Sequence, residues 1–193
     1  MSGLFSFVPL PLKIPFAPMD ALSVEVIPAG AEWQYEPKWD GFRCLIFRDG
    51  NDVQLQSKSG QPLARYFPEI VDAVRALKPK QFVLDGELVI PTANEFSFDN
   101  LLMRLHPAAS RVQKLSKEIP ARFIAFDLLA NTKAKSLVAL PLRERRSALE
   151  KFFGANLQAK KAFQLSEATQ DLKTVKFKYP TGPVDMSGSG FPE

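Results

Sequence analysis

The sequence predicts an α+β domain of mostly antiparallel strands with helices packed outside them. Short apolar runs with strand-like alternation dominate the first half, as in 52–56, where Val53 and Leu55 alternate with glutamines. Segments with apolar residues at helical spacing lie between these runs, the first of them over 67–77. At 193 residues the chain has the length of one ordinary domain and is long enough to bury a core.

The apolar runs that predict strands cover, in chain order, 43–48, 52–56, 81–90, 121–130 and 162–168. The first two are joined by Asp-Gly-Asn-Asp, a sequence typical of a hairpin turn. Three segments predict helices: 67–77 with Pro68 in its opening turn, 97–105 with Ser97 as its N-cap, and one that Pro141 opens and that continues through Phe153.

Composition at the ends of the chain predicts three regions: a Pro-rich N-terminal segment over 1–20, a domain over 21–170, and an irregular tail over 171–193. The first segment lacks a basic start followed by a continuous apolar core, so it predicts a leader strand or loop and not a signal peptide. No apolar run is long enough to span a bilayer. We therefore expect a cytoplasmic protein with no membrane partner.

Charge and cysteine content narrow the function classes. The net charge of +4 is compatible with a polyanionic partner. The single cysteine, Cys44, excludes an internal disulfide and a cysteine-based zinc site, and its apolar neighbours predict a small buried residue. The charge run Arg-Glu-Arg-Arg at 143–146 predicts a solvated helix face.

The stretch YEPKWDGFR, which ends at Arg43, places Lys38 immediately before a strand, in one cluster with Asp40, Gly41 and Arg43. A single lysine is ordinarily a solvated surface charge. A lysine can attack phosphorus only as the neutral amine, and desolvation or a nearby cation favours that form. The company of Arg43 therefore makes Lys38 a candidate nucleophile.

Two acids interrupt the apolar strand LDGELVI. Asp85 and Glu87 are two residues apart, so they should share one face of the strand, while Gly86 leaves room for a close approach. A salt bridge to a neighbouring strand would account for them. They could also bind a divalent metal, because phosphoryl-type transfer needs carboxylates for a metal and cations for the developing charge. The chain therefore contains the carboxylates and cations that this chemistry needs, with Lys58 as a further cation. Phe126 adds an aromatic face on which a base could stack.

These stretches resemble, in order, the motifs of ATP-dependent DNA ligases, within the covalent nucleotidyltransferase superfamily. EPKWDGFR resembles the lysine-nucleotidylation motif K-x-D-G-x-R, and LQSKSGQPLARYFPEI the next motif with its FPE helix. LDGELVI resembles the third motif and FIAFDLL the one after it, and the LPLRERRSALE helix also fits. The style is closest to the small bacterial repair ligases. The resemblance implies an adenylation domain with a nucleotidyltransferase (ATP-grasp-like) fold, in a cytoplasmic, nucleoid-associated monomer.

The resemblance also implies roles for single residues. Lys38 would attack the α-phosphorus of ATP, release pyrophosphate and carry AMP, which then passes to the 5′-phosphate of nicked double-stranded DNA. Glu36 would lie beside the adenine, and Pro37 and Trp39 would shape the pocket. Arg43 would contact the ribose or the phosphate, and Lys58 would contact the nucleotide where the family usually has an arginine. Glu87 would bind the ribose or, together with Asp85, Mg²⁺ or Mn²⁺. Phe126 would stack on the base.

The end of the chain departs from the family pattern. The family continues with an E-G-(V/L)-V strand, yet this sequence contains no Glu-Gly dipeptide. Lys176 and Lys178 have the K-x-K spacing of the last motif, but too few residues precede them for the missing E-G-(V/L)-V strand to fit in between. Either a deletion has joined the segments on both sides of that strand, or the K-x-K match is chance. The OB-fold domain that normally follows is also missing from the pattern.

Three functions remain open on the sequence. The first is a truncated ligase adenylation domain acting in DNA repair, with slow or absent self-adenylation and no detectable nick sealing. The second is an inactive remnant that binds ATP or a partner protein. The third is a nucleotidyltransferase that acts on RNA; the wording of EPKWDGFR and FDLL favours the DNA branch.

Overall fold

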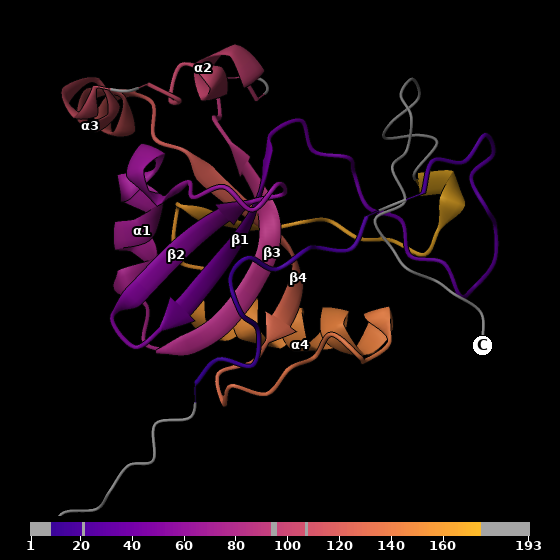
Figure 1. Ribbon diagram of the computed structural model, residues 1–193. Coiled ribbons are helices and arrows are strands. Elements are labelled where there is room, and N and C mark those ends of the chain that lie inside the picture. Colours follow the sequence, from indigo (N-terminus) through magenta and orange to yellow (C-terminus); the bar gives the residue numbers. More distant parts are fainter. Residues whose placement is uncertain (1–8, 21, 94–95, 107, 175–193) are drawn as a thin grey trace, which may run out of the picture.

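A computed structural model describes residues 9–20, 22–93, 96–106 and 108–174, and its centre is one twisted sheet (Figure 1). The five strands stand in the order β2-β1-β3-β4-β5. Their bounds are β1 Phe42–Asp49, β2 Asp52–Ser57, β3 Gln81–Val89, β4 Arg122–Ala130 and β5 Phe163–Leu165. The pairs β1–β2, β1–β3 and β3–β4 are antiparallel, whereas β5 runs parallel to β4. The predicted α+β class with mostly antiparallel strands is confirmed.

Four α-helices and one 3-10 turn connect the strands within the described residues. The elements are η1 Ala64–Tyr66, α1 Pro68–Arg75, α2 Phe98–Leu102, α3 Ala109–Glu118 and α4 Leu142–Asn156. Pro68 is the first residue of α1, where its missing N–H costs no hydrogen bond. Ser97 caps α2 by accepting a hydrogen bond from the Asn100 N–H at 3.2 Å. None of the helices in the described part of the chain is long and apolar enough to cross a membrane.

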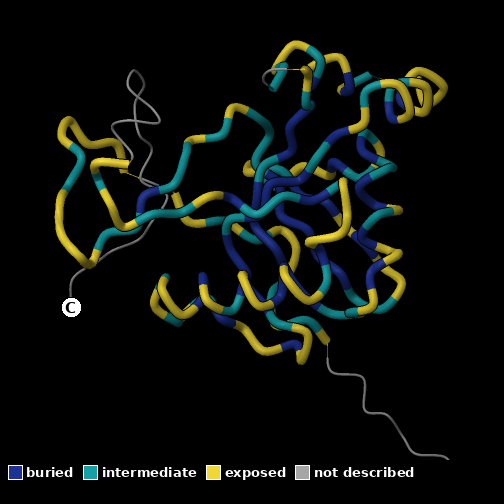
Figure 2. Tube along the Cα trace, turned by 180° about the vertical axis from the view of Figure 1, so that it is seen from behind, coloured by how far each residue is buried: buried dark blue, intermediate teal, exposed yellow. Residues whose placement is uncertain are grey.

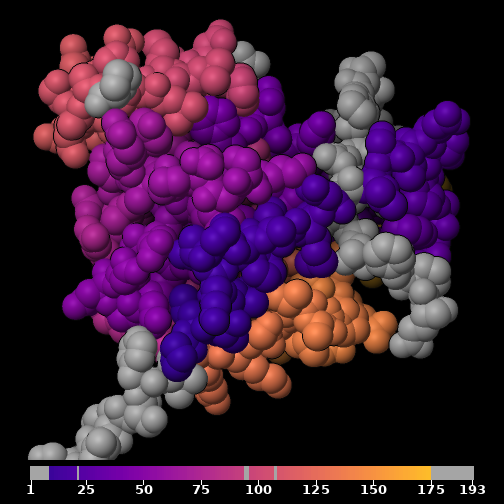
Figure 3. Space-filling model, viewed as in Figure 1, coloured from indigo at the N-terminus to yellow at the C-terminus, as the bar shows by residue number. Residues whose placement is uncertain are grey.

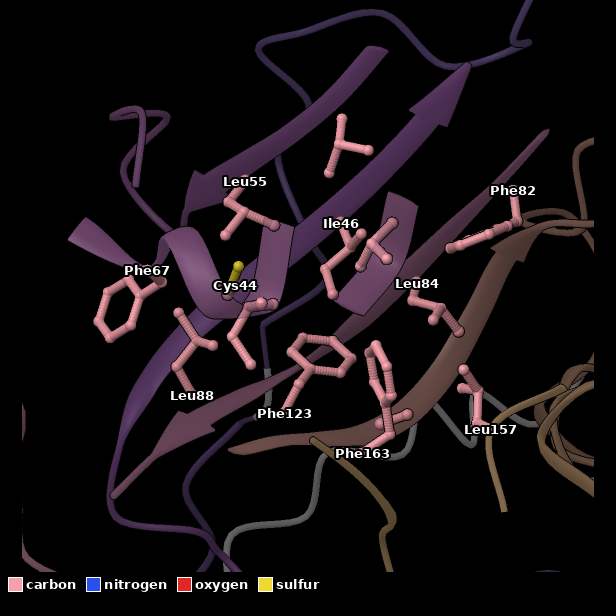
Figure 4. Packing of buried hydrophobic residues seen from close by; sticks show 14 of the residues in the cluster. Cys44, Ile46, Leu55, Phe67, Phe82, Leu84, Leu88, Phe123, Leu157 and Phe163 are labelled. Atoms are coloured by element: carbon pink, nitrogen blue, oxygen red, sulfur yellow. The ribbon is translucent and has the colours of Figure 1, made fainter. Parts of the chain in front are cut away.

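The main core lies on one face of the sheet, under α1 and α4. The strand side chains Cys44, Ile46 and Phe123, labelled in Figure 4, belong to one hydrophobic cluster. The same cluster includes Ile70 from α1 and Leu149 from α4, and all five residues are fully buried. Figure 2 shows this buried centre between the exposed turns of the helices. The expectation that Cys44 is a small buried residue is confirmed.

The N-terminal segment covers part of the opposite face. Leu10, Leu12 and Phe16 pack against strand residues that include Leu45 and Phe47. The Gln56 side chain fixes this segment by accepting a hydrogen bond from Phe16 N at 2.9 Å and donating one to Phe16 O at 2.6 Å. In Figure 3 the first indigo residues lie across the front of the molecule. The rest of this face, beyond the segment, holds the charged residues of the candidate site.

Two sequence expectations about local structure need correction. Helix α3 was not predicted, because only two of its residues, Val112 and Ser116, are buried and its apolar pattern is weak. Only half of the charge run at 143–146 is solvated: Arg143 and Glu144 are exposed, whereas Arg145 and Arg146 are 3% and 8% exposed. Both buried arginines have partners that lie far away in the sequence, so the run itself could not reveal their burial.

Glycines in the two central motifs permit close approach of backbones. A Cβ atom at Gly86 would overlap the carbonyl oxygen of Ile124 and the ring of Phe123 on the neighbouring strand. A Cβ atom at Gly41 would overlap the Leu88 carbonyl oxygen, where the chain enters β1 beside β3. Since neither overlap involves only flexible side-chain ends, both positions require glycine.

We expect Gly86→Ala to lower the free energy of unfolding by about 3 kcal/mol, because the added methyl group must push β3 and β4 apart. Urea denaturation followed by circular dichroism measures this change. The matched control is Gly154→Ala in α4, where the nearest atom to the added Cβ is 3.9 Å away. That change should raise stability by up to about 1 kcal/mol. Equal effects of the two changes would contradict the steric argument.

Candidate functional site

A pocket of about 170 Å³ opens on the second face of the sheet, beside the start of β1. Its walls come from five parts of the chain: the segment before β1, β1 itself, the end of β2, β3 and β4. The lining residues are Glu36, Pro37, Lys38, Trp39, Arg43, Lys58, Glu87 and Phe126. The fold therefore gathers cations, two carboxylates and aromatic rings that lie up to 90 positions apart in the sequence.

The segment that carries Lys38 is held from both sides. Tyr35 exchanges backbone hydrogen bonds of 2.8 and 3.0 Å with Thr169. The indole Nε1 of Trp39 donates to Ser166 Oγ at 3.0 Å, and its ring meets the edge of Phe96 at 5.6 Å between centroids. These contacts fix the chain on either side of Lys38, which lines the pocket and is itself exposed.

Arg43 is held by Asp85 and covers an aromatic ring. Its Nε and Nη2 donate to the two oxygens of Asp85 at 3.2 and 2.8 Å, and Asp85 is 2% exposed. The guanidinium carbon lies 5.4 Å from the centroid of Phe126, a cation–π arrangement. Asp85 thus forms the cross-strand salt bridge that the sequence left open as one reading, and both its oxygens are occupied by Arg43.

Glu87 faces the pocket without such a bidentate partner. Burial raises its pKa to about 8, Arg43 opposes this, and the nearby carboxylates Asp85 and Asp40 raise it further. Burial likewise raises the pKa of Asp85 to about 6, against the opposing effect of Arg43. The pocket therefore favours a proton, or another cation, on Glu87.

Glu36 is the second buried carboxylate of the pocket. Its Oε1 accepts a hydrogen bond from Gln34 Nε2 at 2.6 Å, whereas its Oε2 is buried and has no hydrogen-bond partner among the described residues. Glu36 and Pro37 also line a second, larger hollow of about 510 Å³, which reaches Arg146 and Ser166. The two hollows meet at Glu36.

Asp20, at the end of the N-terminal segment, reaches the cations of the pocket. Its Oδ1 lies 2.7 Å from Lys58 Nζ and 3.8 Å from Arg43 Nη1. The hydrogen bond with Lys58 lowers the pKa of Asp20. A carboxylate of the chain itself therefore occupies the place where an anionic ligand of Lys58 would bind.

The structure brings together eight of the residues that the sequence analysis assigned to the site: Glu36, Pro37, Lys38, Trp39, Arg43, Lys58, Glu87 and Phe126. Asp85 lies behind Arg43 and does not line the pocket. Lys176 and Lys178 lie outside the described residues. Sequence reasoning missed Asp20 and Arg146. Only the position of Arg146 in the charge run could have marked it.

A metal site made by protein side chains alone is absent from the described ranges. No group of three or more His, Cys, Asp or Glu residues within them could hold an ion. The pocket offers one carboxylate, Glu87, to a cation. Mg²⁺ commonly binds through one or two carboxylates and completes its shell with phosphate oxygens and water. The residues present therefore fit a metal that arrives with a nucleotide, not a resident one.

Comparison with known proteins identifies relatives of the whole arrangement. Residues 18–178 match the family model described as ATP dependent DNA ligase domain. The chain is 48% identical over 167 residues to DNA ligase C2 of Mycolicibacterium smegmatis and 45% identical over 168 residues to DNA ligase C of Mycobacterium tuberculosis. Each match covers 86% of this chain and 46% of the relative, so the chain spans about half the length of these proteins.

Solved structures agree with the sequence matches. The ligase domain of LigD from M. tuberculosis superposes with a TM-score of 0.59 at 27% identity, over 79% of this chain and 46% of that one. A mycobacterial DNA ligase D complexed with ATP and MES gives a TM-score of 0.58 at the same identity and coverage. The expected nucleotidyltransferase fold is therefore confirmed, and this chain belongs to the family of ATP-dependent DNA ligase domains.

Proposed function

We propose that this domain binds ATP in the pocket around Lys38 and transfers the AMP group to that lysine. The observation that carries the proposal is the position of Lys38 in one pocket with Arg43, Lys58 and Glu87, opposite the ring of Phe126. Two more cations beside the nucleophile suit a polyphosphate, and an aromatic wall suits a base. One of the solved relatives is described as complexed with ATP.

The chemical step joins Lys38 Nζ to the α-phosphorus of ATP. The amine nitrogen forms the new N–P bond, the bond from the α-phosphorus to the bridging oxygen breaks, and pyrophosphate leaves with the bonding electrons. The nitrogen loses one proton to water in forming the phosphoramidate. Arg43 and Lys58 stabilise the negative charge on the phosphate oxygens, and Phe126 offers its ring to the base.

Glu36 offers the base a hydrogen-bond acceptor. Its buried Oε2 has no hydrogen-bond partner in the described structure, and a carboxylate oxygen in that state destabilises the protein until a donor arrives. The 6-amino group of adenine is such a donor. This agrees with the expectation that Glu36 lies beside the adenine.

A divalent cation, Mg²⁺ or Mn²⁺, would be held by Glu87 together with the phosphates, and would neutralise phosphate charge when bound. Asp85 is the less suitable ligand, because Arg43 occupies both its oxygens. The raised pKa of Glu87, to about 8, means that a cation at this carboxylate displaces a proton near neutral pH.

The AMP acceptor that we propose is the 5′-phosphate of a nick in double-stranded DNA, in the repair role of a cytoplasmic bacterial protein that acts as a monomer. The family of the chain and the names of its relatives support DNA over RNA. Nicked DNA and nicked RNA offered as alternative acceptors to the adenylated protein would separate the two classes.

The decisive experiment is incubation with ATP and Mg²⁺ followed by intact-mass spectrometry. We expect an adduct with the mass of AMP to form slowly on the wild-type protein and to be abolished in Lys38→Ala and in Lys38→Arg, because neither side chain supplies a primary amine at that position. Lys80→Ala, in the loop before β3, is the control and should retain the adduct. A wild-type protein that binds ATP but never gains the adduct would leave only an ATP-binding function.

We expect Asp20→Asn to bind ATP about two- to fivefold more tightly, because an exposed ion pair contributes modestly and its carboxylate occupies Lys58. The gain should fade at high salt, which screens exposed charges. Titration of intrinsic tryptophan fluorescence measures the Kd, since Trp39 lines the pocket. Asp72→Asn is the control, because Asp72 is also in an exposed pair, with Arg75. Weaker binding by Asp20→Asn would show that Asp20 assists the ligand instead of competing with it.

We expect Glu87→Gln to stabilise the protein more at about pH 9 than at about pH 5. Burial raises the pKa of Glu87 to about 8, so between its unfolded pKa of about 4.3 and that value the folded state holds a proton that the unfolded state has lost. Wild-type stability therefore falls across this window as pH rises, and glutamine removes the loss. Urea unfolding at both pH values tests this, with Glu118→Gln on the exposed surface of α3 as control. A pH-independent difference would refute the burial argument.

A further inference from the structure

The contact between Glu36 and Arg146 is incomplete on both sides. Arg146 Nε donates to Glu150 Oε1 at 2.7 Å and Nη2 donates to the Ser166 carbonyl oxygen at 2.9 Å. Its Nη1 is buried, has no hydrogen-bond partner in the described structure, and lies 3.9 Å from Glu36 Oε1. The side chains of Arg146 and Glu36 are 9% and 7% exposed. Such a pair is an electrostatic contact without a hydrogen bond, and it leaves Glu36 Oε2 free for a ligand.

The charge on Glu36 decides which ligand group this oxygen can meet. An ionised carboxylate only accepts hydrogen bonds, whereas a protonated one also donates. Among purines, adenine has an amino group at position 6, which donates, and guanine has a carbonyl oxygen there, which accepts. An ionised Glu36 therefore suits a 6-aminopurine, and a protonated Glu36 suits a 6-oxopurine.

We propose that Arg146 is a specificity-determining positioning residue: by favouring the ionised form of the buried Glu36, it selects adenine over 6-oxopurine nucleotides. This inference rests on the proposed function, because it assigns the base to the part of the pocket that Glu36 lines. Arg146 acts through Glu36 and does not itself touch the base. Its two hydrogen bonds, to Glu150 and to the chain after β5, hold its guanidinium group beside the carboxylate.

The charges around Glu36 make this selection between bases depend on pH near neutrality. Burial raises the pKa of Glu36 to about 7, and Arg146 is the strongest opposing influence, followed by the nearby Ser166 and by Gln34, which donates the hydrogen bond to Oε1. Asp127 on β4 raises the pKa slightly, and Arg145 on α4 neutralises Asp127 through hydrogen bonds of 2.9 and 3.1 Å. Removal of the Arg146 charge would raise the pKa of Glu36 further, so that the carboxyl group is protonated at neutral pH.

The test compares the affinities for ATP and inosine triphosphate, which differ only in the group at position 6 and in its ring proton. The ratio of their Kd values is measured within one protein, so a fraction of unfolded variant cancels. For the wild type we expect the preference for ATP to grow about tenfold as Glu36 ionises, since one unpaired buried polar group has about that effect. In Arg146→Gln the preference at neutral pH should fall about fivefold, because about half of the wild-type Glu36 carboxyl groups are ionised there, and the rise in preference should shift to higher pH.

Two further variants separate positioning from structure. Arg146→Lys keeps the positive charge and should retain the preference for ATP at neutral pH. Glu36→Gln has an amide that both donates and accepts and does not titrate, so its preference should be small and independent of pH. Carboxyl-¹³C NMR of Glu36 in the protein without nucleotide gives a second readout, and its titration should move to higher pH in Arg146→Gln.

The outcomes distinguish this inference from the proposed function. If ATP binds and adenylates Lys38, but Arg146→Gln changes neither the ratio nor the titration of Glu36, this inference is wrong and the proposed function stands. If the titration moves while neither nucleotide binds the wild type, Arg146 tunes Glu36, but the nucleotide pocket and the selection by base are both overturned.

Discussion

Three carboxylates lie buried on or beside one face of the sheet, and each faces an arginine. The pairs are Asp85 with Arg43, Asp127 with Arg145, and Glu36 with Arg146. A buried carboxylate without a partner costs several kcal/mol, so the fold depends on these arginines being delivered to the same interior. The pairs join β1 to β3, β4 to α4, and the segment before β1 to α4. They therefore tie together the elements that surround Lys38.

The pairs differ in how many hydrogen bonds join them, and the pair without a hydrogen bond is the one whose carboxylate lines the pocket. Arg43 and Arg145 each engage both oxygens of their aspartates, and neither aspartate lines the pocket. The pair of Glu36 and Arg146 is longer, at 3.9 Å, and each of the two side chains has a buried atom without a hydrogen-bond partner among the described residues. The saturated pairs stabilise the frame, whereas the unsaturated one keeps an acceptor for a ligand, which is typical of functional sites.

Close backbone approach is the second condition for the site. Gly41 lets the chain pass the Leu88 carbonyl as it enters β1, and Gly86 lets β3 lie against Ile124 of β4. Both glycines belong to the motifs that also carry Lys38 and Glu87. Each motif thus combines a chemical group with the small residue that allows the backbone to place that group.

The sequence by itself determined the features that depend on neighbouring residues. The hairpin of β1 and β2, the starts of α1 and α2, and the cluster around Lys38 were all readable, because alternation, caps and turn residues act over a few positions. The ordered motifs also predicted a set of site residues, of which eight line one pocket, although their roles stay predictions.

Only the tertiary structure decided which charges are buried and what they meet. The charge run that holds Arg145 and Arg146 looks solvated in sequence, yet their partners Asp127 and Ser166 are 18 and 20 positions away. Asp20 reaches Lys58 only because Gln56 fixes the N-terminal segment on the sheet. The physical reason is that desolvation depends on all the elements that pack around a group, and a local pattern of residues contains no record of them.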